Sequence, residues 1–300
     1  MSRRRRSAAV SASAVVAVLA VGALAVGGVV WFLSEREPAL SRQRCAATLD
    51  GADWYLTTVQ SQNAALIVGT SIQRDLPARA ATIGVATALQ ESSLVNIDYG
   101  DRDSLGLFQQ RPSQGWGTPA EIMDPVYSTN AFYDGLVEVD GWQDMEVTVA
   151  AQAVQRSAFP EAYAQHETRS RAWASALTGH SPGSLTCQLF AVTEDEPVDL
   201  VDRLRQDLGI PADAVTAVEP DADEVRQAID ATTLGYEDPD RSVWAVAHWA
   251  VATASVTDVV EVRAGDQVWT RADAVWAPLD DSADPTSADQ VLVAVGSPPG

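Results

Sequence analysis

The amino-terminal stretch constrains this chain more than any other part of its sequence. Four consecutive arginines, Arg3 to Arg6, precede a run of 26 residues, Ala8 to Leu33, that carries no charge. About 20 residues of helix cross the apolar core of a bilayer, so this run is long enough to span one. We therefore expect an Arg-rich cytoplasmic tip and one transmembrane helix within residues 1–34, with membrane contact through residues 8–33.

A cleaved signal peptide is the alternative. Signal peptides have a shorter apolar core that ends at a small-residue cleavage site, and Ala23-Leu24-Ala25 could imitate such a site. The apolar sequence continues past it through Trp31 and Phe32, which favours an anchor. In either case the arginines stay in the cytoplasm and the chain after Ser34 lies outside. We predict a single-pass protein of the cell membrane whose bulk is extracytoplasmic.

The chain is strongly acidic, with 41 Asp and Glu against 20 basic residues and a net charge of -21. A surface of that sign repels phosphate backbones, so we expect no nucleic-acid partner.

Only two cysteines are present, Cys45 and Cys187. Outside the cytoplasm, an even pair of cysteines indicates a disulfide, and these two bracket one segment that such a bond would close. The alternative is two unrelated buried thiols. Neither cysteine has another Cys or a His at ligand spacing, so we expect no metal site and no cofactor.

The segment from Cys45 to Cys187 has the periodicity of helices, and no strand pattern interrupts it. We expect helices at residues 53–68, 75–94, 120–138, 144–157 and 160–178, with a long loop over 96–118. Residues 35–44 are polar and are expected to form a short linker.

The pattern changes after Cys187. Residues 198–208, 222–234 and 242–254 are expected to be helices, residues 259–270 a β-hairpin, and residues 291–295 a strand. The predicted fold is thus a mostly helical α domain over residues 45–187, followed by a small α/β domain of unknown role over 188–300.

Glu91 is the best candidate for chemistry. It lies near the end of a predicted helix whose other residues are small or apolar. Desolvation and the partial negative charge of a helix C-terminus both favour the neutral carboxylic acid. A carboxyl that stays protonated near neutral pH can act as the general acid that a glycosidic oxygen needs. The alternative is an ordinary Glu at a helix end, facing solvent.

The loop that follows supports the first interpretation. Glu91-Ser92 is followed 15 residues later by Gly106-Leu107-Phe108-Gln109, with Phe108 where Met is usual. This pair of motifs resembles the soluble lytic transglycosylases of the lysozyme-like superfamily over about 130 residues, Cys45 to near Leu177. The resemblance implies a lysozyme-like fold, Glu91 as the catalytic acid and base, Ser92 as its support and Gln109 on the cleft wall. We place the adjacent Gln110 with the substrate-binding residues.

The third motif of that family, Ala-x-Tyr-Asn-Ala-Gly, is altered here. It should fall near residues 152–157, where the chain has Gln-Ala-Val-Gln-Arg-Ser. Gln155 could replace the Asn as an amide contact to sugar, and Tyr163 could line the cleft, although core packing would explain Tyr163 equally well. The departure leaves substrate positioning and the reaction outcome open.

Two further features bear on the chemistry. Asp101 or Asp103 could supply a second carboxylate, since many glycosidases use two; alternatively these aspartates cap the turn and pair with Arg102 or Arg111. Without a second carboxylate, the N-acetyl group of the substrate could assist and a 1,6-anhydro product would form, as the resemblance implies. Trp116 is the best candidate for stacking on a sugar ring.

The predicted function is therefore cleavage of peptidoglycan glycan strands by a lytic transglycosylase or muramidase-type glycosidase with a single Glu acid/base. Peptidoglycan is the expected partner, and the domain would face the cell wall. The sequence around Trp244 and Trp269 also resembles small domains appended to actinobacterial cell-wall hydrolases. The alternative function is a non-catalytic wall-binding or envelope-assembly protein that retains a lysozyme-like fold.

Overall fold

A computed structural model describes residues 43–157, 160–192, 197–218, 224–280 and 286–296. These residues belong to one compact unit, Gln43–Gly300. The predicted transmembrane segment lies outside the described residues. Among the residues described, no helix is both long and apolar enough to cross a membrane.

A small antiparallel sheet joins the two ends of the segment that the cysteines bracket. Strand β1 (Arg44–Leu49) pairs on one side with β2 (Ala52–Thr57) and on the other with β3 (Leu185–Gln188). The register places Cys45 opposite Cys187, and the two form a disulfide. The predicted disulfide is confirmed, and it joins β1, the central strand of this sheet, to β3.

The local sequence explains how this sheet passes into the first helix. Asp50 and Gly51 both have positive φ, 52° and 75°, as the tight turn of a hairpin requires. Helix α2 (Thr58–Gln73) then begins at a capping box, in which Thr57 and Gln60 exchange side-chain and backbone hydrogen bonds.

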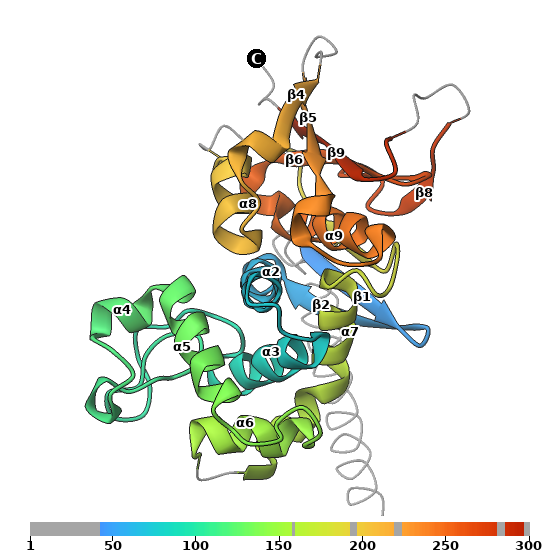
Figure 1. The fold of residues 1–300 in the computed structure, drawn as a ribbon. Helices are drawn as coiled ribbons and strands as arrows, with labels where there is room; N and C mark the ends of the chain where they lie inside the picture. Colours follow the sequence, from blue (N-terminus) through green and yellow to red (C-terminus); the bar gives the residue numbers. More distant parts are fainter. Residues whose placement is uncertain (1–42, 158–159, 193–196, 219–223, 281–285, 297–300) are drawn as a thin grey trace, which may run out of the picture. The chain divides into compact units, whose positions relative to one another are not determined.

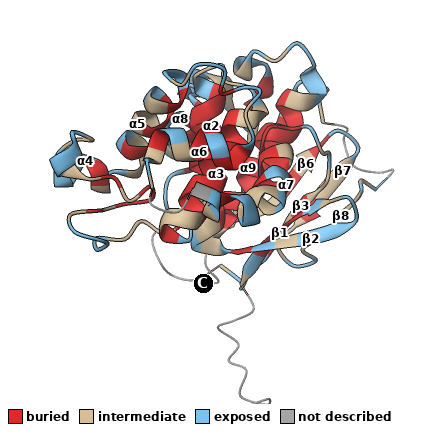
Figure 2. Cartoon of the chain, turned by 90° about the horizontal axis from the view of Figure 1, so that it is seen from below, coloured by how far each residue is buried: buried red, intermediate tan, exposed pale blue. Residues whose placement is uncertain are grey.

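Helix α3 (Ala78–Ser92) is the centre of the helical layer. It contacts α2 and four later elements of the same region. The four are α5 (Pro125–Val137), α6 (Val147–Gln155), the 3-10 turn η3 (Pro160–His166) and α7 (Glu167–Leu177). The same region also contains the short helix α4 (Pro119–Met123) and the 3-10 turn η2 (Pro112–Gln114). Figure 2 shows buried residues concentrated along α2, α3 and α9.

The remaining described residues form a larger antiparallel sheet with two helices (Figure 1). Its strand order is β4-β5-β9-β6-β7-β8. The strands are β4 (Val215–Val218), β5 (Glu224–Asp230), β6 (Val259–Ala264), β7 (Gln267–Thr270), β8 (Trp276–Pro278) and β9 (Gln290–Gly296). The helices are α8 (Leu200–Leu208) and α9 (Pro239–Thr257), with 3-10 turns η4 (Ala212–Ala214) and η5 (Ala231–Leu234). Helix α9 contacts β6 and β9 of this sheet and also α2 and α7.

The predicted fold class is wrong. The described residues form a mixed α/β structure with two antiparallel sheets, where we expected a mostly helical domain followed by a small α/β domain. Residues 53–57 were predicted as helix because Trp54 and Leu56 fit a helical pattern, but they pair with β1. Residues 224–230 were also predicted as part of an amphipathic helix, but they pair with β4 and β9. Strand β2 forms a hairpin with the adjacent β1, whereas β5 also pairs with the distant β9. In both cases the strand depends on its neighbours in the sheet, which helical periodicity does not reveal.

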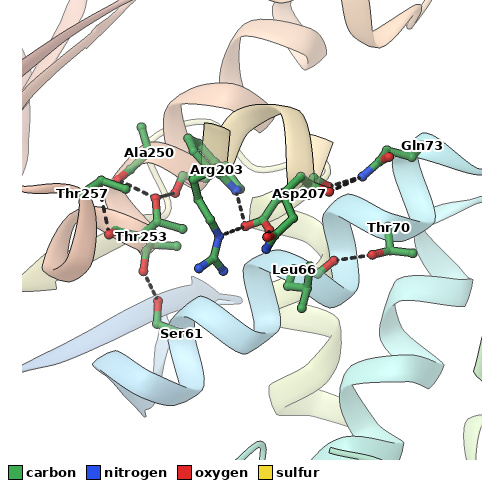
Figure 3. Close-up of polar contacts among 12 residues, drawn as sticks. Ser61, Leu66, Thr70, Gln73, Arg203, Asp207, Ala250, Thr253 and Thr257 are labelled. Atoms are coloured by element: carbon green, nitrogen blue, oxygen red, sulfur yellow. Dashed lines mark hydrogen bonds and ion pairs between the residues drawn. The ribbon is translucent and has the colours of Figure 1, made fainter. Parts of the chain in front are cut away.

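One buried residue, Asp207, joins α8 to both α9 and α2 (Figure 3). Asp207 is fully buried, and its carboxylate accepts hydrogen bonds from Arg203 Nε at 2.7 Å and Trp249 Nε1 at 3.0 Å. Its backbone oxygen accepts a hydrogen bond from Gln73 Nε2 of α2 at 2.8 Å. That oxygen would lie only 2.2 Å from a Cβ at Gly69, so α2 needs glycine where α8 crosses it. The segments on either side of Cys187 therefore share a polar and tightly packed contact.

Replacing Asp207 with Ala should lower the free energy of unfolding by about 3 kcal/mol, because Arg203 and the Trp249 N–H lose their buried partner. Urea denaturation followed by tryptophan fluorescence measures this. The control is Asp202→Ala, which removes the exposed partner of Arg205 on the same helix and should cost no more than about 0.5 kcal/mol. Equal losses in the two variants would contradict the role given to Asp207.

His248 of α9 is also fully buried, beside the rings of Trp244 and Trp276. Its Nδ1–H donates to the backbone oxygen of Ala176 in α7 at 2.8 Å. Its Nε2 has no hydrogen-bond partner among the described residues. Burial lowers the pKa of His248 to about 4 from an ordinary value of 6.5, so the folded protein holds a neutral imidazole.

We expect the folded protein to lose stability as the pH falls from 6.5 to 4, by up to about 3 kcal/mol from this residue. The unfolded chain binds a proton to His248 throughout this window, whereas the folded chain resists protonation, so acid favours unfolding. Urea titrations at several pH values measure the slope. His248→Asn keeps an N–H donor and does not titrate, and the slope should become shallower; an unchanged slope would assign the effect to another group.

Candidate functional site

Glu91 lies on the wall of a cleft of about 600 Å³. It occupies the last turn of α3, in which every residue from Ala80 to Leu89 is buried. The helix is surrounded by protein along most of its length. Its last turn places the half-buried carboxyl of Glu91 at the cleft. Glu91 is thus placed where a ligand can reach it while much of its surface is out of water.

Tyr163 holds the Glu91 carboxyl from behind. Its hydroxyl donates to Glu91 Oε1 at 2.6 Å, and its side chain is fully buried in η3. Burial and the neighbouring carboxylate both raise the pKa of Tyr163, so the phenol stays protonated and remains a donor. Tyr163 is not part of the cleft lining, so it acts on a ligand only through Glu91.

Opposing influences set the pKa of Glu91. Burial raises the pKa above its ordinary value of 4.5 and is the largest effect. Hydrogen bonds from Tyr163 and Gln155 lower it, as does the positive charge of Arg111, but together they do not cancel the burial. The result is a carboxyl that is easier to protonate than an ordinary Glu and that still has donors ready for its ionised form.

Ser92 ties the helix end to the loop that follows. Its Oγ lies 2.7 Å from the backbone oxygen of Leu107 and 3.1 Å from that of Ala88. The helix ends abruptly after it, because Ser93 and Leu94 both adopt left-handed φ, 55° and 57°. Ser92 is buried and does not line the cleft, so its contact is structural support for Glu91.

The loop over residues 95–118 is folded by its own backbone. Gly106 has φ 76°, and a Cβ there would lie 2.7 Å from the backbone oxygen of Ile122, so glycine is required. Gln109 has φ 48°, and its amide donates to the backbone oxygens of Tyr99 and Gly106, both at 3.3 Å. Gln110 donates to Ser128 O at 3.0 Å and is buried. Both glutamines reach the cleft wall.

Gln155, at the end of α6, reaches Glu91. Its Nε2 donates to the backbone oxygen of Phe108 at 2.7 Å, and its side chain also hydrogen-bonds to Glu91. Phe108 stacks on Phe132 with ring centroids 4.5 Å apart. Gln155 therefore connects α6, the loop and the carboxyl.

The two aspartates proposed as a second carboxylate are already engaged. Asp101 accepts a hydrogen bond from Arg111 Nη2 at 2.7 Å. Asp103 accepts from the backbone N and the hydroxyl of Ser113 at 2.8 and 3.0 Å, and these bonds lower the pKa of Asp103. Asp101 lines the cleft and Asp103 does not. These contacts agree with the alternative interpretation, in which the aspartates cap the turn and pair with an arginine.

The cleft brings together six of the predicted residues. These are Glu91, Asp101, Gln109, Gln110, Trp116 and Gln155. Ser92 and Tyr163 lie behind Glu91, and Asp103 lies outside. The sequence did not point to Gln114, Arg156 and Ser157, which also line the cleft; Arg156 has φ 52° at the end of α6, a position that local patterns do not mark as functional.

No protein-family model matches the chain, and a search of curated proteins found no match either. Among the described residues, no three His, Cys, Asp or Glu side chains come together in a way that would hold a metal ion. The case for function therefore depends on the cleft and its carboxyl.

Replacing Tyr163 with Phe should raise the pKa of Glu91 further, because the variant loses a hydrogen bond that favours the carboxylate. The measurement is a carbon NMR titration of glutamate side chains, with the Glu91 signal assigned by its loss in Glu91→Gln. Tyr127→Phe is the matched control, since that hydroxyl donates to Trp116 O and makes no contact with Glu91. A pKa that stays constant or falls in Tyr163→Phe would contradict the assignment.

Proposed function

We propose that this protein cleaves the glycan strands of peptidoglycan, with Glu91 acting first as a general acid and then as a general base. The observation that carries the proposal is a half-buried carboxyl of raised pKa, held by a buried phenol and an amide, at the wall of a cleft of about 600 Å³. Volumes of this order are typical of ligand sites. The match of Glu91-Ser92 and Gly106 to Gln109 with lytic transglycosylases points the same way.

The glutamines and the tryptophan that line the cleft suit a sugar that bears an N-acetyl group. Four glutamines are among the lining residues: Gln109, Gln114 and Gln155, and also Gln110, whose amide is buried and donates to Ser128 O. An amide offers both donor and acceptor atoms, which match the hydroxyl and acetamido groups of amino sugars. Trp116 adds an aromatic face of the kind on which the apolar side of a sugar ring packs.

The proposed reaction begins with proton transfer from neutral Glu91 to the glycosidic oxygen. The bond from this oxygen to the anomeric carbon breaks, and the leaving sugar departs as an alcohol. The acetamido oxygen of the substrate stabilises the positive charge at the anomeric carbon. The carboxylate of Glu91 then takes the proton of the C6 hydroxyl, whose oxygen bonds to the anomeric carbon. A 1,6-anhydro sugar forms, Glu91 regains its proton, and no water is consumed.

The neighbours of Glu91 fit both halves of this cycle. Burial favours the acid that the first step needs. Tyr163 and Gln155 hydrogen-bond to the carboxylate that the second step needs, and Arg111 adds a favourable charge. Because Asp101 is paired with Arg111, assistance from the acetamido group of the substrate accounts for the chemistry better than a second protein carboxylate.

A membrane anchor through residues 8–33 would place this cleft on the extracytoplasmic side of the cell membrane, where the cell wall lies. The enzyme would then act on strands close to the membrane surface.

A second candidate function is wall binding without cleavage. The observation that favours it is the use of the Gln155 amide within the protein, on Phe108 and Glu91, where the related motif offers its amide to sugar. A cleft of this kind could hold a glycan strand and perform no chemistry.

The test is digestion of purified peptidoglycan by the full-length protein in detergent, compared with Glu91→Gln. We expect the substitution to reduce product formation by at least about 10²-fold, the usual worth of a general acid. Mass spectrometry should detect 1,6-anhydro products, whereas reducing-end products would indicate hydrolysis. Folded wild-type protein that binds strands and releases no product would support the second candidate.

A further inference from the structure

A second hollow of about 620 Å³ adjoins the cleft that holds Glu91. We call it the second lobe; it is lined mainly by the end of α5 and by α6, and Glu91 is not among its lining residues. The two hollows share four lining residues, Gln114, Trp116, Gln155 and Arg156. A ligand that fills the first can therefore continue past Trp116 into the second.

Trp116 is seated against α5 at Gly135. A Cβ at Gly135 would lie 3.4 Å from Trp116 Cη2 and 3.1 Å from Val154 Cγ1, so the missing side chain allows the indole to pack closely there. The indole is thus supported by α5 while it lines both hollows. Because Trp116 lines both hollows, a branched ligand could occupy both of them and contact the indole from each.

The chemistry of the second lobe differs from that of the first. The floor includes the apolar residues Val139, Ala153 and Val154, of which Val154 is only 7% exposed. Two opposite charges border it, the carboxylate of Glu138 and the guanidinium of Arg156. Glu138 lies at the C-cap of α5, where the helix dipole disfavours a negative charge. Its position is electrostatically unfavourable for the helix and suited to binding a cation.

The second lobe thus combines apolar side chains with one carboxylate and one guanidinium. A short peptide with small apolar side chains, a free amine and a free carboxylate uses all three. Peptidoglycan strands carry such peptides as branches on their sugars. We propose that the second lobe binds the peptide branch of the sugar held in the first cleft, with Glu138 receiving an amine and Arg156 a carboxylate. This rests on the proposed function, and it makes the substrate a peptide-bearing strand.

The test measures binding by calorimetry, in the full-length protein with Glu91→Gln so that no turnover occurs. The probes are a peptidoglycan tetrasaccharide that carries its peptides and the same tetrasaccharide with the peptides removed. We expect tighter binding of the peptide-bearing probe. Adding Glu138→Gln should weaken the binding of that probe about tenfold, which is the usual contribution of a hydrogen bond to a charged group. The affinity for the bare tetrasaccharide should not change.

Two further variants keep the interpretation specific. Asp140→Asn removes the same charge from an exposed position two residues away that does not line the lobe, and it should change neither affinity. Ala153→Trp fills the lobe from an exposed position on α6 and should weaken only the peptide-bearing probe.

Equal affinity for the two probes, or an equal effect of Glu138→Gln on both, would overturn the inference, including the case in which the lobe holds further sugar rings. Failure of the proposed function is separate and is seen in wild-type digestion. Peptide-dependent binding without cleavage would support the role of the second lobe and contradict the proposed enzymatic activity. Cleavage without any preference for the peptide-bearing probe would support the enzymatic activity and contradict the role of the second lobe.

Discussion

The burial of α3 among α2, α5, α6 and α7 is the constraint on which the site depends. The enclosed part of this helix, Ala80 to Leu89, carries only small or apolar side chains, and a Cβ at Gly84 would already lie 2.7 Å from the Tyr133 hydroxyl oxygen. The enclosed helix cannot shift to give its last turn more water. Glu91 is therefore held in partial desolvation by the packing of residues far from it, and its raised pKa is a consequence of that packing.

The groups around Glu91 act against this desolvation without removing it. Tyr163, Gln155 and Arg111 favour the carboxylate, while burial favours the acid and is the largest effect, so the pKa of Glu91 stays above its ordinary value. Such a balance suits a residue that must give up a proton and take one back within a single proposed cycle. A fully exposed Glu would lack the acid form at neutral pH, and a buried Glu without these donors would lack a stable carboxylate.

The residues after Cys187 support the same scaffold. Helices α8 and α9 contact α2, and α9 also contacts α7, so two of the helices that enclose α3 are themselves backed by the later part of the chain. The contacts are close: a Cβ at Gly69 would meet the backbone of Asp207, and one at Gly179 would lie 2.0 Å from Arg241 O. Buried polar groups at these crossings, such as Asp207 and His248, require specific partners and so favour one arrangement.

The sequence by itself determined the features that depend on neighbouring residues. Most helices lie where periodicity predicted them, since that signal is local, and the position of Glu91 near a helix end follows from the same pattern. The two cysteines indicated their disulfide because no other partner existed. Local patterns also predicted the hairpin at residues 259–270 and the strand at 291–295, which are present as β6, β7 and β9. Only the tertiary structure decided how distant strands pair, since β1 pairs with β3 and the two cysteines on these strands are 142 residues apart. The tertiary structure alone also placed Tyr163 on Glu91 and set the burial that raises the pKa of this carboxyl, because both arise from contacts between segments distant in the chain.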